Sequence, residues 1–209
     1  MSSQIEELLK SANSTEEPVN SVNSARRSFQ NEVESRAFFE EVCSGLLDIN
    51  EWRRNSTPSS YALFDESGAD VSGRTIREGD FIRISIRGSG KYDWVRVLRI
   101  NKTDDEMVIT VQPTYDPTAD PPDPNVVSHF FHPDARNNFC VQREGKVVNF
   151  YVIGLNERQN VSDTGGIVES VRNSATANLG YYLGLQKGVW TEFCKNFLRA
   201  GDEKGTSDD

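Results

Sequence analysis

Both histidines of this 209-residue chain lie in one short stretch, residues 128–139, which reads SHFFHPDARNNF. His129 and His132 are three residues apart, a spacing that brings two side chains together on one helical turn. With Asp134 they could begin a metal site, but zinc sites use three or four ligands, and no further ligand is marked by spacing. The two phenylalanines between the histidines favour a packed turn. We therefore predict that both histidines belong to the core and that no metal is bound; the alternatives are ligand contact or proton handling, and a metal site.

The sequence lacks the common catalytic and nucleotide-binding motifs. It contains no Gly-x-Ser-x-Gly elbow, no Walker sequence and no Gly-x-Gly-x-x-Gly after an expected strand. Cys140 follows the histidines closely enough for a Cys–His pair, but its strand-like surroundings favour a buried thiol. These observations favour a protein that is not an enzyme and that has no cofactor.

A second group of polar residues follows the last expected strand. Asn156 and Glu157 end that strand, and Arg172 comes in the first turns of an expected helix. Polar groups at strand ends and helix starts can surround the mouth of a ligand pocket, so these three residues are candidate binding residues. The alternative is that Glu157 and Arg172 lock the helix onto the sheet.

A third group combines arginine with aromatic residues on two neighbouring expected strands. Arg83 lies on one strand, and Tyr92, Trp94 and Arg96 alternate along the next, so one face of the sheet could present all four. Trp, Tyr and Arg dominate the energetics of protein interfaces. We therefore predict a protein-contact surface here, extended by the acidic, proline-rich loop over residues 116–127.

Composition excludes some classes of partner. The formal net charge of −9 argues against nucleic acid, which is bound through a basic surface. No apolar run approaches the roughly 20 residues that span a bilayer, so no membrane is expected. The three cysteines are isolated and odd in number, which predicts buried free thiols in a reducing compartment. The N-terminus does not resemble a secretory signal, so the expected location is the cytoplasm, in a bacterium.

The pattern of elements predicts one domain with two polar ends. Residues 1–30 are read as a flexible polar arm, residues 31–200 as a single α+β domain and residues 201–209 as a disordered acidic tail. Helical spacing of apolar residues predicts one helix from about residue 31 to Trp52. Alternating runs then predict about five or six antiparallel strands, and two helices close the chain, the first ending at Gly184 and the second carrying Trp190. The fold class is therefore α+β, with a curved antiparallel sheet or small barrel, a helix before it and an αα-hairpin packed on it.

Two resemblances accompany this interpretation. The segment GDFIRISIRGSGKYDWVRVLRI resembles the core hairpin of small SH3-like barrels. The order helix, curved sheet, closing helix resembles START-like lipid-binding folds, although the strand that those folds place before their first helix is not found in the sequence. Neither resemblance assigns a functional residue.

The leading functional hypothesis is a non-enzymatic protein-binding or adaptor module of the cytoplasm, whose oligomeric state the sequence leaves open. The alternative is a small-molecule-binding protein or hydrolase. Its pocket would lie between the sheet and the C-terminal helices, lined by His129, His132, Asn156, Glu157 and Arg172.

Overall fold

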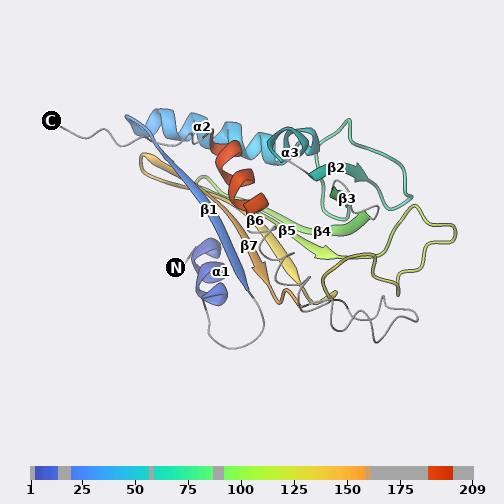
Figure 1. Cartoon of the computed structure of the whole chain (residues 1–209). Helices are drawn as coiled ribbons and strands as arrows, with labels where there is room; N and C mark the ends of the chain where they lie inside the picture. Colours follow the sequence, from blue (N-terminus) through green and yellow to red (C-terminus); the bar gives the residue numbers. More distant parts are fainter. Residues whose placement is uncertain are drawn as a thin grey trace.

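The computed structural model describes residues 3–13, 20–56, 59–86, 92–158, 160 and 188–199. They form an antiparallel sheet with helices on both of its faces (Figure 1). The elements, in chain order, are α1 (Gln4–Ala12), β1 (Ser21–Ser28), α2 (Glu32–Leu46), α3 (Ile49–Asn55), β2 (Ser59–Phe64), β3 (Phe81–Ile86), β4 (Tyr92–Lys102), β5 (Glu106–Pro113), β6 (Arg136–Glu144), β7 (Val147–Leu155) and a helix over residues 188–198.

The sheet has seven strands in the described residues, in the order β1-β7-β6-β5-β4-β3-β2. From β2 to β7, each strand pairs with the next strand in the chain. β1 pairs with β7 on the edge that does not pair with β6. The α+β class with a curved antiparallel sheet is confirmed. The sheet is open, with β1 and β2 at its edges, so neither the small barrel nor an SH3-like barrel is found.

The N-terminal residues hold two elements that the sequence analysis assigned to a polar arm. α1 begins with a capping box, in which Ser3 and Glu6 satisfy each other's backbone N–H groups, and Ile5 is fully buried. β1 pairs with β7 over its whole length. This corrects the expected arm, and β1 also supplies the strand before the first long helix that a START-like arrangement requires. The alternation of β1 is weak because Ser, Asn and Arg outnumber its apolar residues.

The single helix expected up to Trp52 is two helices. The backbone leaves the helical path after Leu47, and Asp48 caps α3 by accepting a hydrogen bond from the N–H of Asn50 at 2.9 Å. The break turns α3 so that Trp52 and Ile49 reach the same core as α2. Apolar spacing alone did not reveal the break, because the spacing continues across it.

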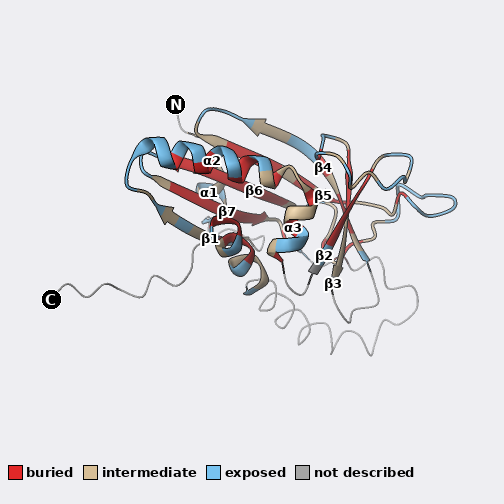
Figure 2. Ribbon diagram, turned by 90° about the horizontal axis from the view of Figure 1, so that it is seen from above, coloured by how far each residue is buried: buried red, intermediate tan, exposed pale blue. Residues whose placement is uncertain are grey.

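The main core lies between the sheet and α2, α3 and the helix over residues 188–198. We call this side of the sheet the α2 face. Figure 2 shows that the buried residues concentrate on the strands and on the sides of the helices that face them. Aromatic rings fill the centre of this core, joined in a chain of ring pairs: Trp52, Tyr61, Phe139, Phe150, Phe193 and Phe197.

The opposite side, the α1 face, is covered in two places. α1 packs Ile5 against Val108, Cys140 and Ile153 near the β1 edge. Toward the β2 edge, a separate cluster holds Ala62, Phe64, Phe81 and Trp94, with Tyr115 packed against it. Both faces therefore carry apolar residues, which explains why several strands read as apolar on both sides.

The two hairpins expected from the sequence are present. The β3–β4 register pairs Arg83 with Trp94, and the β6–β7 register closes from Glu144 to Val147. The second turn therefore holds Gly145 and Lys146, and Gly145 adopts a φ of 57°, which glycine tolerates and which a two-residue turn requires.

Of the expected C-terminal αα-hairpin, the structure describes only the second helix, over residues 188–198. The first helix of that hairpin and the acidic tail lie outside the described residues. No helix in the described part of the chain is long and apolar enough to cross a membrane.

Candidate functional site

Three of the four residues of the predicted contact surface gather on the α1 face. The guanidinium carbon of Arg83 lies 5.0 Å from the ring centre of Phe64 and 4.7 Å from that of Tyr92. Arg96 lies over the Phe81 ring at 5.4 Å. We call Arg83, Tyr92 and Arg96 the arginine–tyrosine surface. Stacking on rings orders the guanidinium groups. Arg96 also forms an ion pair with Glu66, with 3.8 Å between the charged atoms.

The expectation that Trp94 presents its ring at this surface is wrong. Its side chain is 1% exposed and packs edge-on against Phe64, with ring centres 5.1 Å apart. The residue shares a face with Tyr92 and Arg96, as the alternation predicted. The loop that leaves β5 passes beside it, since the Trp94 N–H donates to the carbonyl of Ser128 at 2.8 Å. Strand periodicity identifies the face of a residue but not what covers it.

A small cavity of about 130 Å³ opens beside the arginine–tyrosine surface at the β2 edge. The Arg53 side chain reaches it from α3 and donates to the carbonyl of Tyr61 at 3.1 Å. Asp70 lies close enough to Arg53 and Arg83 for their charges to help lower the pKa of its carboxyl, after the larger effect of hydrogen bonds from Ser72. The cavity is lined by Arg53, Ser60, Tyr61, Ala62, Arg83, Ser85 and Tyr92.

Arg53 is a lining residue that the sequence analysis missed. In the sequence, Arg53 lies near the charged C-terminal end of an expected helix, a common position for arginine. Its spacing from the next expected strand does not indicate that the two are in contact. The turn of α3 away from α2 is what brings it to the β2 edge.

The acidic, proline-rich loop runs over the surface as expected, and residues 118–126 are exposed. Asp116 and Asp123 accept hydrogen bonds from groups two residues ahead, Thr118 and Asn125, which holds two local turns. These carboxylates therefore shape the loop. The described residues contain no group of three or more His, Cys, Asp or Glu side chains able to hold a metal ion.

The two histidines do not form one site. His129 is buried, and its Nδ1 accepts a hydrogen bond from the N–H of Phe131 at 2.8 Å. His132 is near the surface beside Asp134, with 3.2 Å between Nδ1 and the carboxylate oxygen. The prediction of a core residue in a packed turn describes His129 and does not describe His132.

His129 gives the fold a pH dependence. Burial lowers the pKa of its imidazole, partly opposed by the charge of Asp93. As pH falls below about 6.5, the imidazole of His129 takes up a proton in the unfolded chain before it does so in the folded protein. Protonation therefore favours the unfolded chain, and the free energy of unfolding decreases on acidification.

We expect His129→Asn to weaken that loss, because the Asn oxygen can still accept the Phe131 N–H but cannot titrate. The free energy of unfolding, measured by urea titration at about pH 7.5 and 5.5, should fall less for the variant, with a difference of up to about 1.4 kcal/mol per pH unit. Equal losses in both proteins would contradict this role for His129.

Glu157 is the most deeply buried carboxylate of the candidate residues, at 3% exposure. Its carboxylate lies flat over Gly154 on the α2 face, so close that a Cβ added to Gly154 would overlap its atoms. The side-chain N–H of Asn137 donates to Oε1 at 2.9 Å, and the Ser21 hydroxyl also donates to the carboxylate. Ser21, Gly154 and Asn137 are partners across three adjacent strands, β1, β7 and β6.

Among the described residues, the partners of Glu157 are neutral, so they hydrogen-bond its carboxylate without balancing its charge. Burial raises the pKa of the carboxyl, and the hydrogen bonds from Ser21 and Asn137 only partly oppose this. The folded protein thus holds this proton more tightly than the unfolded chain, and stability declines as pH rises from the ordinary value of about 4.5 through the raised pKa.

We expect Glu157→Gln to remove that decline while keeping the oxygen that accepts from Asn137. The difference in melting temperature, variant minus parent, should therefore become larger as pH is raised from about 4.5 to 8. Glu144→Gln is the matched control, because Glu144 also accepts from an Asn side chain, at 3.1 Å, but is exposed. A constant difference across this pH range would show that Glu157 ionises as freely as it does in the unfolded chain.

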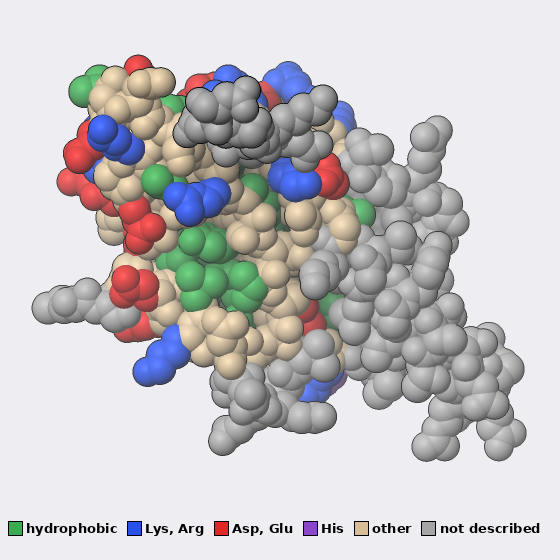
Figure 3. All heavy atoms as spheres, turned by 60° about the vertical axis from the view of Figure 1, so that its left-hand side comes forward, with side chains coloured by type: hydrophobic (Ala, Val, Ile, Leu, Met, Phe, Trp, Pro, Cys, Tyr) green, Lys and Arg blue, Asp and Glu red, His purple; other side chains and the backbone are tan. Residues whose placement is uncertain are grey.

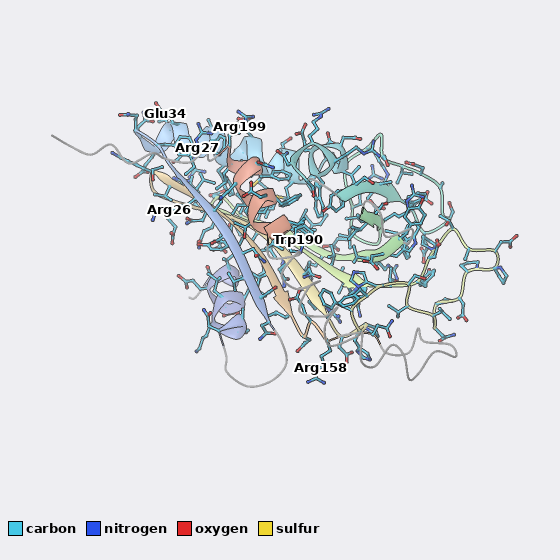
Figure 4. The ribbon with its side chains drawn as sticks, in the orientation of Figure 1. Arg26, Arg27, Glu34, Arg158, Trp190 and Arg199 are labelled. Carbon is cyan, nitrogen blue, oxygen red and sulfur yellow. The ribbon has the colours of Figure 1, made fainter. Side chains whose placement is uncertain are left out.

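Of Asn156 and Arg172, the two candidates grouped with Glu157, the structure describes only Asn156. Asn156 takes a φ of 56°, and its backbone N–H donates to Asn20 at 3.0 Å. Arg158 is exposed and points away from the body of the molecule (Figure 4). Arg172 lies outside the described residues. Sequence reasoning found Glu157 but missed its partners Asn137, Ser21 and Gly154, because their relation depends on the pairing of β1 with β7.

All three cysteines are free and buried, as predicted. Burial raises the pKa of the Cys43 and Cys194 thiols to about 12, and it raises the pKa of Cys140 as well. A thiol held neutral in this way is a poor nucleophile, which removes the support for a Cys140–His pair.

No protein-family model matches the chain, and no curated protein matches it. Similar solved structures include the hypothetical protein jhp0584 from Helicobacter pylori, with a TM-score of 0.50 and 11% identity, over 91% of this chain and 92% of that one. TTHA0849 from Thermus thermophilus has a TM-score of 0.39 and 11% identity, over 86% and 95% of the two chains. Major latex-like protein 151 from Panax ginseng has a TM-score of 0.39 and 12% identity, over 86% and 96%. The likeness to the Helicobacter protein shows a shared α+β fold.

Proposed function

We propose that this protein is a recognition module that binds an acidic segment of a partner protein at the arginine–tyrosine surface. The observation that carries the proposal is the cavity of about 130 Å³ at the β2 edge, lined by two guanidinium groups, two serines and a half-exposed tyrosine. Its size suits one carboxylate side chain rather than a whole small-molecule ligand, for which pockets are several times larger.

The chemistry of the lining supports this assignment. Arg83 is held between Phe64 and Tyr92, which reduces the entropy lost when its planar group binds a carboxylate. Tyr92 is 53% exposed and offers a ring edge and a hydroxyl to a partner. The acidic surface of the rest of the protein disfavours acidic partners. At the cavity, two guanidinium groups stand against the nearby carboxylate of Asp70, so an acidic segment is favoured there over the rest of the surface.

The proposal can be tested with a short glutamate peptide as the probe. In ¹H–¹⁵N NMR spectra at low salt, we expect shifts of the backbone amides of Ala62, Arg83 and Tyr92 and of the Arg83 side chain. Arg83→Gln should weaken binding about tenfold, since losing a central arginine contact costs more than about 1 kcal/mol. Arg99→Gln is the matched control, because Arg99 is an exposed arginine on the same face of β4. Shifts that survive in Arg83→Gln, or that are absent in the parent protein, would overturn the proposal.

A second candidate function is favoured by Glu157. A buried carboxylate with a raised pKa is a common feature of functional sites. Among the described residues the partners of Glu157 are neutral, and Glu157 lies on the face that the helix over residues 188–198 covers. Under this alternative, the protein binds a small molecule with a hydrogen-bond donor near Glu157 and Asn137. Native mass spectrometry of the protein purified from its source should then detect a bound compound that Glu157→Gln retains less well. A spectrum of the bare chain alone would exclude this candidate.

A further inference from the structure

The two edges of the sheet differ in how their outward backbone groups are satisfied. At the β2 edge, the carbonyl of Leu63 accepts from the N–H of Val71 at 2.8 Å, and the N–H of Leu63 donates to Ser72 at 2.9 Å. The carbonyl of Tyr61 accepts from Arg53. A returning segment and a helix therefore cover β2, which is how proteins commonly protect an edge.

β1 has none of this protection within the described residues. The N–H of Phe29 donates to the carbonyl of Lys146 at 2.8 Å, which continues the ladder between β1 and β7. Because hydrogen-bonded pairs alternate along an antiparallel ladder, the odd-numbered residues of β1 bond to β7 and the even-numbered ones turn their N–H and C=O groups outward. The outward residues are Val22, Ser24, Arg26 and Ser28, and all four are exposed.

β1 is also regular enough to act as a template. Its register with β7 runs without a bulge from Ser21 to Ser28, and it contains neither proline nor glycine. Figure 1 shows β1 along the outer side of the sheet, and Figure 3, which turns that side forward, shows apolar side chains between acidic and basic ones. Val22 is 37% exposed, and Leu8 and Leu9 of α1 are only partly buried nearby.

We propose that β1 pairs antiparallel with β1 of a second copy of this chain, across a two-fold axis at Ser24. The ladder would then join two sheets edge to edge. In this register Ser24 faces Ser24 of the partner subunit, and Val22 faces Arg26 of the partner subunit. The outward N–H and C=O groups of the two β1 strands would then form hydrogen bonds with each other.

The choice of a second copy follows from the charge and size of the residues on β1. The chain carries a net charge of −9, but β1 contains two arginines and no carboxylate, so pairing at this edge brings no carboxylates of the two copies together. In the proposed register no like charges lie opposite each other, and the long Arg26 side chain can cover exposed Val22. A shift that placed Arg26 opposite Arg26 of the partner subunit would be unfavourable for the same reason.

The helix over residues 188–198 lies over a face of β1 and not along its outward edge. The helix over residues 188–198 contacts β1 from the α2 face, where Thr191 bonds Asn23 and the Leu198 carbonyl accepts from Arg27. Arg27 is therefore held over its own subunit, close to α2 (Figure 4), while Arg26 on the other face remains exposed. Of the two arginines, Arg26 is thus the one that meets the partner.

Ser24→Cys tests the register directly, since the two introduced thiols would face each other across the axis. The native cysteines are buried, so they do not compete. Under mild oxidation we expect a covalent dimer that forms at least about tenfold faster than for Val33→Cys, whose position on α2 is 80% exposed. Equal rates for the two variants would overturn the proposal.

Light scattering supplies the second measurement. The parent protein should have the mass of two chains, and Ser24→Pro should have the mass of one. Proline removes only an outward N–H at this position, so circular dichroism should show a retained fold, and Ser24→Ala should stay dimeric. A parent protein that is monomeric at every concentration would exclude the pairing. A Ser24→Pro protein that is folded and still dimeric would show that the copies meet elsewhere.

Discussion

Trp52→Ala is expected to cost about 4 kcal/mol of unfolding free energy, the upper range for removing a buried aromatic side chain. Trp52 is 1% exposed and lies at the centre of the aromatic core. Its ring centre is 4.3 Å from that of Phe139 and 5.6 Å from those of Tyr61 and Phe193. Its Nε1–H also donates to the carbonyl of Leu46 at 2.9 Å, which ties α3 to the end of α2. The variant therefore loses a packed ring from three neighbours and leaves a buried carbonyl unsatisfied.

Trp190→Ala is the matched control for this substitution. Trp190 belongs to the same cluster, with its ring centre 5.4 Å from Phe139, but it is only partly buried. Urea unfolding of both variants should show a clearly smaller loss for Trp190→Ala. Since whole domains are stable by only about 5–15 kcal/mol, Trp52→Ala should also be partly unfolded at 37 °C. If the two variants lost the same amount of unfolding free energy, Trp52 would contribute no more to stability than the partly buried Trp190.

Gly154→Ala is expected to destabilise the protein by about 3 kcal/mol, an unusually large effect for adding one methyl group. The added carbon would overlap the carboxyl atoms of Glu157, so the carboxylate must move. Moving it breaks the hydrogen bonds from Asn137 and Ser21 and leaves the buried side-chain amide of Asn137 without this partner. Alanine is otherwise acceptable in a strand, so the cost measures this one contact. Gly73→Ala, where no atom lies within 4 Å, should change stability by less than about 0.5 kcal/mol.

A double-mutant cycle isolates the contact between Gly154 and Glu157. In a Glu157→Ala background the space over Gly154 is empty, so Gly154→Ala should cost little or should stabilise the protein slightly. The coupling energy from the four unfolding free energies should then approach the full cost of the single glycine variant. If Gly154→Ala costs the same in both backgrounds, the destabilisation comes from the backbone and not from the carboxylate.

The aromatic core bears on the choice between the two functional hypotheses. Rings of Trp52, Phe139 and Phe193 occupy the middle of the α2 face. The N–H of His132 donates to the carbonyl of Arg158, the residue after Glu157, but the Nδ1 atoms of the two histidines contact Phe131 and Asp134. Among the described residues, the hydrogen-bond partners of Glu157 are Asn137 and Ser21 and not the histidines. This is why the arginine–tyrosine surface is the leading proposal and a ligand at Glu157 the second.

The sequence by itself determined the elements whose residues alternate or repeat strongly. The strands from β2 to β7 follow from period-two patterns that each strand carries alone, and the β6–β7 turn follows from Gly145. The position of Arg83 and Tyr92 on one face follows from the same alternation. Such signals are local, because side-chain direction in a strand is fixed by the backbone and not by distant contacts.

Only the tertiary structure decided the features that depend on pairing between distant segments. β1 is polar and has no clear pattern, and it becomes a strand because β7 offers a complete ladder to it. That pairing places Ser21 beside Gly154 and so creates the buried setting of Glu157. In the same way, the covering of Trp94 and the approach of Arg53 to β2 depend on a loop and a helix turn that periodicity does not encode. Burial is a property of what packs against a residue, and the packing partners here lie far apart in the chain.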